Sequence, residues 1–500
     1  MKRLMFAKSR RSPLFPALAC LVSLSVIPAH SAVADALESS IASTGSTPPF
    51  VTKLSLRDCI DQALSGNHAK AASRYSIEIA EAQHRQALSA YWPLIGIKAT
   101  YTIMDEDPNF IFPGRAISLQ GMSIPINTPS GQIQLSTLPV PEQDVKLMDK
   151  KNFVASLDAT LPLYTGGKIS SVVRQAEQGL RAAKEESRRT DLQVVYDTTR
   201  YYYGAVLGKE LLRIGRESLA RMEVTLELTE NLYTRGSGKV KKTDYLRNKT
   251  MVEGLRSAVS ALEANEQLAK AALTNSMGLP WDTHIEVADE KLPYTEIQFE
   301  LQDLVSDAYR FNPDWARMEA GLAAGEAKID EARSGHLPKI GLFGSLSRIE
   351  NSYDKGIVTP ENRNSWVIGI GLELPLFDGL RTTNEVREAK ARLNKLKEQQ
   401  ILLREGLALQ VKHLFIQLRR ARAQKVSSES AAISAEENRA LNERAYQEEL
   451  VETQDVIEAQ LMESVAKAQY QKTLYDNLEA RANLDFVVGK ELTELIEKTD

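Results

Sequence analysis

A strand-like segment that leads into a very long helix occurs twice in this chain, and it restricts the possible folds more than any other feature. The later copy, residues 366–381, reads Trp-Val-Ile-Gly-Ile-Gly-Leu-Glu-Leu-Pro-Leu-Phe-Asp-Gly-Leu-Arg. Large apolar residues alternate with small or polar ones, which is typical of a strand with one apolar face. Proline has no N–H to donate, so Pro375 predicts the end of the strand ladder. After Gly379 there is no proline, and the periodicity becomes helical.

The earlier copy, residues 153–168, reads Phe-Val-Ala-Ser-Leu-Asp-Ala-Thr-Leu-Pro-Leu-Tyr-Thr-Gly-Gly-Lys. Pro162 matches Pro375 and Gly166 matches Gly379, and no proline follows from residue 163 to residue 279. We therefore expect two equivalent strand-to-helix junctions, marked by these two prolines and two glycines.

The junctions belong to an internal two-fold repeat. Residues 54–102 align without a gap on residues 299–347, at a constant offset of 245. Asp58 then pairs with Asp303 and Asn67 with Asn312, and beyond the loops the offset becomes 213. Each half therefore predicts the order helix, strand, loop, strand, helix, helix.

The repeat predicts the following division of the chain. The first repeat covers residues 54–279, with one helix over 54–90, strands at about 94–104 and 152–163, and long helices over 168–235 and 243–278. The second covers 300–489, with one helix over 301–335, strands at about 339–349 and 365–376, and long helices over 381–449 and 453–488. A loop over 105–150, an N-terminal linker over 35–53, a mixed segment with a strand-like 285–287 over 280–299 and a tail over 490–500 complete the chain.

Residues 1–34 have the features of a secretory signal peptide. A basic start precedes an apolar run over residues 14–27 that is too short to span a membrane, and Ala32-Val33-Ala34 offers a cleavage site. Cys20 follows a loose lipobox, so a lipoprotein remains an alternative. Cys59 is the other cysteine, and its repeat partner Leu304 predicts a buried small hydrophobic residue.

The predicted strands are long enough to cross a bilayer. Each has about ten residues, the length of a tilted transmembrane strand with one apolar and one polar face. Open strand edges cannot face lipid, because each unpaired backbone group there costs several kcal/mol. Four strands therefore predict a barrel shared between copies of the chain, with eight strands from two copies or twelve from three. The sequence pattern leaves both numbers open.

The two longest helices indicate a coiled coil. Each runs nearly 70 residues, and at ~1.5 Å per residue each would reach roughly 100 Å. In the later one, leucine, valine and alanine at positions 386, 389, 393, 396, 403, 407 and 414 fall on a pattern of alternating three- and four-residue spacings, which Gln400 and Gln410 interrupt. This narrow seam is typical of coiled-coil packing.

This pattern resembles the TolC family of outer-membrane efflux proteins. The resemblance covers residues 54–489, and the duplicated L-P-L-[YF]-x-G junctions and the tyrosine-led helical turns carry it. It implies an α+β membrane protein, in which four strands per chain contribute to a trimeric twelve-stranded barrel that a long antiparallel helical tunnel continues. It also implies a homotrimer in outer-membrane lipid of a Gram-negative cell, extending into the periplasm. An exit duct of this kind serves efflux or type I secretion, with a periplasmic adaptor and an inner-membrane pump of RND, ABC or MFS type.

The resemblance also suggests functional residues at the helical turns. In the second turn, Tyr446, Asp455 and Glu458 match the family pattern, and the resemblance places Asp455 and Glu458 at the periplasmic aperture. Spaced three apart, the two acids share a helix face, and threefold symmetry would gather six carboxylates into a cation-attracting ring. The alternative is an ordinary helix start, with Thr453 as N-cap and acids in the first turn.

In the first turn, Tyr233, Gly236 and Asp244 occupy the corresponding positions, and together with Tyr446 they mark the hairpin tips where an adaptor would make contact. Counted from the tyrosine that leads each turn, Asp244 comes two positions later than Asp455. Gly238 and Lys239 are therefore interpreted as an insertion.

Other classes of function are less well supported. No nucleophile–base motif, metal-ligand spacing or cofactor motif is present, so we expect no enzyme, metal or cofactor. A net charge of −4, without a basic stripe, argues against nucleic-acid binding. The alternative function is a soluble periplasmic coiled-coil adaptor or spacer, but that protein would leave the apolar row at 366, 368, 370, 372 and 374 in water.

Overall fold

The computed structural model describes residues 52–118, 124–135, 137–236, 240–296 and 300–490. The predicted signal peptide with Cys20, residues 35–51 of the linker and the tail after Lys490 lie outside this part of the chain.

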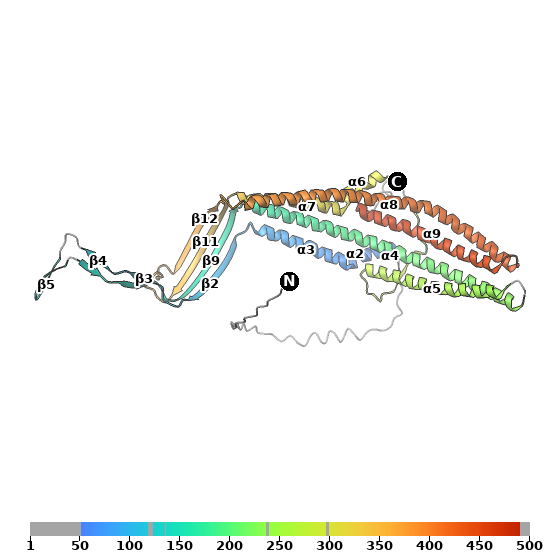
Figure 1. Cartoon of the computed structure of the whole chain (residues 1–500), viewed down its shortest axis with the longest axis horizontal. Coiled ribbons are helices and arrows are strands. Elements are labelled where there is room, and N and C mark those ends of the chain that lie inside the picture. The colour runs from blue at the N-terminus through green and yellow to red at the C-terminus, as the bar shows by residue number, and fades with distance from the viewer. Residues whose placement is uncertain (1–51, 119–123, 136, 237–239, 297–299, 491–500) are drawn as a thin grey trace, which may run out of the picture. The chain divides into compact units, whose positions relative to one another are not determined.

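Four strands form one antiparallel sheet (Figure 1). They are β2 (Leu94–Ile103), β9 (Lys151–Tyr164), β11 (Lys339–Asn351) and β12 (Asn364–Glu373), in the order β12-β11-β9-β2. In the described ranges, β2 and β12 are therefore the open edges of the sheet. The strand expected over 365–376 is β12, which ends at Glu373, two residues before Pro375.

The two faces of β12 differ as the alternation predicts. Trp366, Ile368, Ile370 and Leu372 are each about 70% exposed, so this apolar row has no partner among the described residues. On the other face Gly369 lies opposite Phe343 of β11, and a Cβ at Gly369 would come within 2.6 Å of that ring. The small residues of β12 therefore make room for an aromatic side chain on the neighbouring strand.

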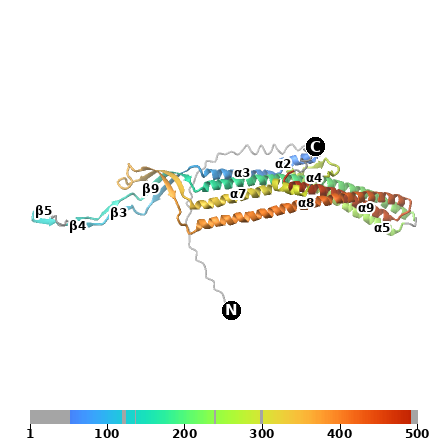
Figure 2. The same ribbon diagram turned by 90° about the horizontal axis from the view of Figure 1, so that it is seen from above.

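Four long helices continue the sheet on one side. They are α4 (Lys168–Thr234), α5 (Lys242–Ser276), α8 (Arg381–Gln447) and α9 (Thr453–Val488). α4 packs along α5 and α9, and α8 packs along α9, so the helices form two antiparallel hairpins side by side (Figure 2). No helix in the described ranges has an apolar stretch that would span a bilayer.

The helices before the sheet are broken, which corrects the expectation of one helix over 54–90 and one over 301–335. The segments are α2 (Leu56–Gly66) and α3 (His68–Ser89), and then α6 (Leu301–Phe311), α7 (Pro313–Arg333) and a short 3-10 turn over 334–336. Asn67 and Asn312 separate them, with ψ of 126° at both positions instead of a helical value.

Each of these asparagines closes one helix, starts the next and ties the break to a long hairpin. The Asn312 side-chain oxygen accepts from the Asp314 N–H at 2.8 Å, and its amide nitrogen donates to the Val487 carbonyl at 2.7 Å. Asn67 does the same with the Ala69 N–H at 2.8 Å and the Ser276 carbonyl at 2.8 Å. Satisfied capping and a buried tertiary hydrogen bond outweigh the continuous helical periodicity.

The segment expected as a loop over 105–150 is instead a long β-hairpin. Its pairs are β3 (Asn109–Phe112) with β8 (Gln143–Lys146), β4 (Arg115–Ser118) with β7 (Thr137–Val140), and β5 (Ile124–Thr128) with β6 (Gly131–Leu135). Its proline and glycine content suggested a loop, but Pro129 and Gly131 lie at the turn between β5 and β6 and leave short alternating stretches on either side.

The buried core lies where the short elements meet the long helices. β1 (Thr52–Leu54), which was not anticipated, pairs in parallel with β10 (Ile285–Val287), the strand-like stretch of the mixed segment. Cys59 packs in this core with Tyr202 and Met277, and all three are fully buried. Burial raises the pKa of the Cys59 thiol to about 12, so this cysteine is an inert hydrophobic side chain.

Candidate aperture at the helical hairpin tips

The turns between the long helices lie at the same end of the helices (Figures 1 and 2). α4 ends at Thr234 and α8 at Gln447, and a left-handed residue follows each, Gly236 with φ of 69° and Glu449 with φ of 59°. Gly236 and Glu449 occupy equivalent positions at the offset of 213. The second turn thus places a glutamate in a backbone conformation that favours glycine.

Asp244 and Asp455 have the same structural role. Asp455 accepts the Glu452 N–H at 3.1 Å, and Asp244 accepts the Lys241 N–H at 2.9 Å. Each carboxylate therefore caps the start of its helix, which is also favourable for the helix dipole. Asp244 and Asp455 correspond at an offset of 211 residues, whereas Gly236 and Glu449 correspond at 213. The first turn therefore contains two extra residues. Gly238 and Lys239 are outside the described residues.

Thr453 is not the N-cap that the helix-start alternative required, because Glu452 occupies that position. Instead Thr453 is buried, and its hydroxyl lies 2.9 Å from that of Tyr446. The Tyr446 hydroxyl also lies 2.9 Å from the hydroxyl of Thr229 in α4, so Tyr446 joins its own turn to the other hairpin.

Tyr233 is positioned differently. Its ring stacks on that of Tyr245 at 6.1 Å between centroids, and the side chain is 40% exposed. Tyr446 is therefore a buried structural residue, whereas Tyr233 belongs to the accessible surface of the tip.

Glu458 lies one helical turn after Asp455, and both side chains are exposed. Glu458 lines an open groove of about 990 Å³ between α5, α8 and α9, together with Arg247, Met251 and Met462. Arg247 donates to the side chain of Gln454 at 2.5 Å, which brings one basic group beside the two acids. A single chain cannot gather these acids into a ring, so their role at an aperture stays a prediction.

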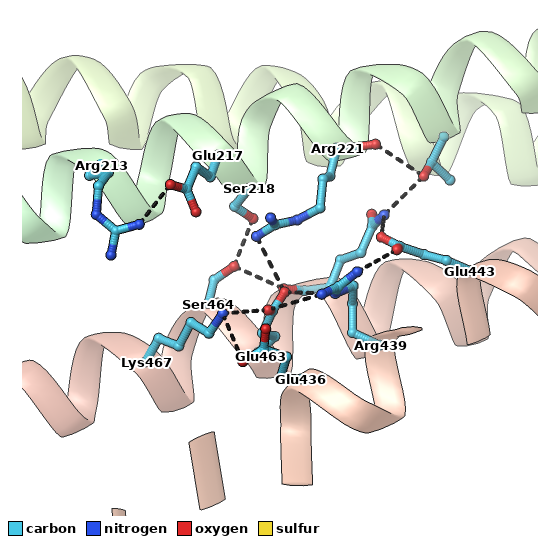
Figure 3. Close-up of polar contacts among 12 residues, drawn as sticks. Arg213, Glu217, Ser218, Arg221, Glu436, Arg439, Glu443, Glu463, Ser464 and Lys467 are labelled. Carbon is cyan, nitrogen blue, oxygen red and sulfur yellow. Dashed lines mark hydrogen bonds and ion pairs between the residues drawn. The ribbon is translucent and has the colours of Figure 1, made fainter. Parts of the chain in front are cut away.

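A buried ionic cluster joins the two hairpins farther along the helices (Figure 3). Glu463 of α9 is fully buried, and its carboxylate lies 2.8 Å from Lys467, 3.0 Å from Arg439 of α8 and 3.3 Å from Arg221 of α4. Three cations from three helices thus surround one acid. Ser464 adds a hydrogen bond of 2.7 Å to Ser218 of α4.

The cluster continues toward the tip through Gln460, Glu443 and Thr225. The Gln460 amide nitrogen donates to Thr225 of α4 at 3.0 Å and to Glu443 of α8 at 2.9 Å, and Glu443 pairs with Arg439 at 2.6 Å. Burial alone would raise the pKa of Glu463. The hydrogen bond from Lys467 and the charges of Arg221, Lys467 and Arg439 outweigh it and lower that pKa below the ordinary glutamate value.

Sequence reasoning missed this cluster. At the offset that aligns the two helix starts, Glu463 falls on Val252, which is buried in an apolar cluster with Met222 and Ile457. The repeat therefore gave no sign of a buried acid. The available signal was an acid with a lysine four residues later, a pattern that is common on exposed helix surfaces.

The strand-to-helix junctions contain left-handed backbone at both predicted glycines. Gly166 and Gly167 have φ of 64° and 84°, and Gly379 and Leu380 have φ of 67° and 66°. A Cβ at Gly166 would lie 2.7 Å from the Cβ of Leu337, whereas none of the described atoms lies within 4 Å of one at Gly379. Two consecutive left-handed residues reverse the chain from strand to helix.

Comparison with known proteins identifies the family. The family model described as outer membrane efflux protein matches residues 59–279 and 304–490, which correspond to the two repeats. The chain belongs to this family. This confirms the resemblance to TolC-like proteins, the α+β channel fold with its two-fold repeat, and the outer membrane as the location.

Similar proteins agree with this assignment. Nodulation protein T of Rhizobium leguminosarum bv. trifolii is 24% identical over 63% of this chain and 67% of its own length. A membrane protein from Pseudomonas aeruginosa, 19% identical, superposes with a TM-score of 0.70 over 88% of this chain and 92% of that one. The outer membrane channel CmeC of Campylobacter jejuni, 16% identical, gives 0.68 over 89% and 88%.

The sequence matches cover between 51% and 67% of the first three curated relatives. Family membership supports an outer-membrane exit channel over the alternative of a soluble periplasmic adaptor. The family consists of channel proteins, not enzymes. In the described residues no group of three or more His, Cys, Asp or Glu side chains could hold a metal ion.

Proposed function

We propose that three copies of this efflux protein form a passive exit duct across the outer membrane and periplasm. The observation that carries the proposal is the open four-stranded sheet. Its edges β2 and β12 have no pairing strand in the part of the chain that the structure describes, and the row on β12 from Trp366 to Leu372 is exposed. Three copies would pair every edge in a twelve-stranded barrel and turn the apolar row toward lipid.

The helical part fits the rest of the duct. At ~1.5 Å per residue, α4 and α8, each of 67 residues, reach roughly 100 Å from the sheet. Transport through such a passive duct would be driven by an inner-membrane pump of RND, ABC or MFS type. A periplasmic adaptor would connect the pump to the hairpin tips, near Tyr233, Gly236 and Asp244.

We assign the aperture to Asp455 and Glu458. Both are exposed in the first turns of α9, and threefold symmetry would bring six carboxylates together. The cluster around Glu463 would hold α8 and α9 against α4 and so set the resting position of these acids.

Recording ionic current through the purified protein in planar bilayers tests the duct. We expect discrete conductance steps with a preference for cations, because acids would line the narrow end. A protein that inserts into the bilayer but conducts no ions would contradict the proposal.

A further inference from the structure

The hairpin that replaces the expected loop carries an exposed apolar surface. We call β3, β4, β7 and β8 the outer arm, because it lies beyond the ends of β2 and β9 that are remote from α4 (Figure 1). Phe110 pairs with Val145 across the ladder, and Phe112 lies on the same face with its ring 4.7 Å from that of Phe110. Phe110 and Phe112 are half exposed and Val145 somewhat less.

The root of the outer arm is held firmly. Asn351, at the end of β11, accepts from the Asp149 N–H at 2.9 Å and donates to the Asp149 carbonyl at 3.0 Å. The Leu147 carbonyl accepts from the Ile357 N–H at 2.8 Å, and Lys146 pairs with Asp107 at 2.7 Å. These contacts tie the arm to the β11–β12 connection, so its direction follows from the sheet.

The arm itself lacks what an isolated hairpin needs. It has only two strands at any level, both edges are open, and a two-stranded ladder is at best marginally stable in water. After Arg115 the β4–β7 pair has no Asp, Glu, Lys, Arg or His, although charged residues are the usual protection of open edges; in the β3–β8 pair the charged residues are Asp144 and Lys146 of β8. These features indicate that the arm packs against a partner.

A second copy of the chain is the partner that the geometry favours. β3 follows β2, the edge strand through which this chain's share of the proposed barrel would meet the next copy. In the proposed trimer, β11 and β12 of the next copy lie between neighbouring arms. The nearest strands of two arms, β3 of one copy and β8 of the next, are therefore three strand spacings, roughly 14 Å, apart along the barrel wall. Neighbouring arms meet along the barrel wall by their edges, so their faces come together only when all three arms lean toward the barrel axis, where sheet faces would pack about 10 Å apart.

We propose that the outer arms of the three copies pack on one another through the face of Phe110, Phe112 and Val145, forming a collar over the external mouth of the barrel. This inference rests on the proposed trimer. It adds to the duct an assembly contact outside the barrel, at the point where exported molecules leave. A membrane surface is the other apolar partner available to the arm, and the experiment separates the two.

Single cysteines on the two faces of the arm provide the test, in a Cys59→Ala background. Gln143 pairs with Phe112 and lies on the apolar face, whereas Asp144 pairs with Ile111 on the opposite face, and both are exposed. The full chain in outer-membrane vesicles is treated with a bismaleimide that spans about 10 Å, the packing distance of two sheet faces. Covalent dimers are then quantified on denaturing gels, because one cysteine per copy can join only two chains.

We expect at least fivefold more covalent dimer from Gln143→Cys than from the matched control Asp144→Cys. Adding Phe110→Asp and Phe112→Asp to Gln143→Cys should reduce the dimer to the control level while the detergent-solubilised protein keeps its trimeric mass.

Two results would overturn the inference in distinguishable ways. A trimeric mass without dimers from Gln143→Cys excludes the collar and leaves the duct intact, and quenching of a fluorophore at residue 143 by brominated lipids would then place the arm on the membrane. A monomeric mass excludes the duct and the collar together.

Discussion

The carboxylate of Glu463 lies 3.0 Å from the guanidinium of Arg439, although Glu463 is fully buried and the two residues belong to different helices. Arg221 of α4 reaches the same carboxylate at 3.3 Å. One buried charge therefore joins both helical hairpins, and removing it would take the shared partner from three cations, of which Arg439 and Lys467 keep Glu443 and Glu436. Breaking a buried ion pair from one side is far more costly than the pair's net contribution to stability.

Glu463→Gln should therefore loosen the hairpins near the tip. We expect a loss of about 3 kcal/mol in local stability, which corresponds to roughly hundredfold faster amide hydrogen exchange in α9 around residue 463. The matched control is Glu436→Gln, because Glu436 contacts the same Lys467 at 3.3 Å but is about half exposed. Equal exchange in the two variants would contradict a structural role for the buried acid.

The same cluster predicts a loss of stability in acid. The folded-state pKa of Glu463 is lowered, so its contribution is fully present above the unfolded value of about 4.3 and disappears as the pH falls through the folded pKa. Thermal unfolding followed by circular dichroism between pH 3 and pH 8 measures this. The difference between wild type and Glu463→Gln should be constant above about pH 5 and shrink below it. A difference that does not change with pH would mean that the charge is unimportant.

The strand-to-helix junctions allow a test of backbone strain. Leu380 has φ of 66° where its repeat counterpart is Gly167, and a left-handed conformation costs a residue with a side chain roughly 1–2 kcal/mol. Leu380→Gly should therefore raise stability by about 0.5–1 kcal/mol after the entropy cost of glycine, whereas Gly167→Leu should lower it. The temperature at which the assembly dissociates on gels reports both changes.

Leu402→Gly is the control for this prediction. Leu402 is exposed within α8, and a glycine there should cost about 1 kcal/mol. Stabilisation by glycine at both positions would contradict relief of backbone strain as the cause at Leu380.

Most of the fold could be predicted from the sequence, because long elements with a single periodicity dominate it. The four strands and the four long helices show their pattern over ten or more residues. The breaks at Asn67 and Asn312 could not be read from periodicity, since the apolar stripe continues through them. They depend on hydrogen bonds to Ser276 and Val487, more than 170 residues away in the sequence. The pairing of the two asparagines in the repeat was the available signal.

The candidate site was less predictable for a physical reason. Asp455 and Glu458 can be found from a motif, but a motif does not distinguish a helix cap from an aperture, and the structure shows that Asp455 caps α9. Whether an exposed acid lines an aperture depends on contacts between copies. The Glu463 cluster combines three helices that are far apart in the sequence, and its repeat counterpart is apolar.

The aperture can be tested without disturbing the cap. Asp455→Asn keeps an oxygen for the Glu452 N–H, and Glu458→Gln keeps the size of the side chain, so the double variant removes charge alone. We expect a lower preference for cations over anions in planar bilayers, with assembly unchanged. Asp244→Asn, at the equivalent cap on the other hairpin, is the matched control. Unaltered selectivity in the double variant would assign Asp455 and Glu458 to the helix start.

The measurement that tests the account most directly is the mass of the detergent-solubilised protein, determined by light scattering with the detergent contribution subtracted. An open sheet with edges at β2 and β12 predicts an oligomer, for which we propose three copies per particle, and aggregation when detergent is removed. A protein that stays monomeric and soluble in plain buffer would contradict the shared barrel, and with it the duct.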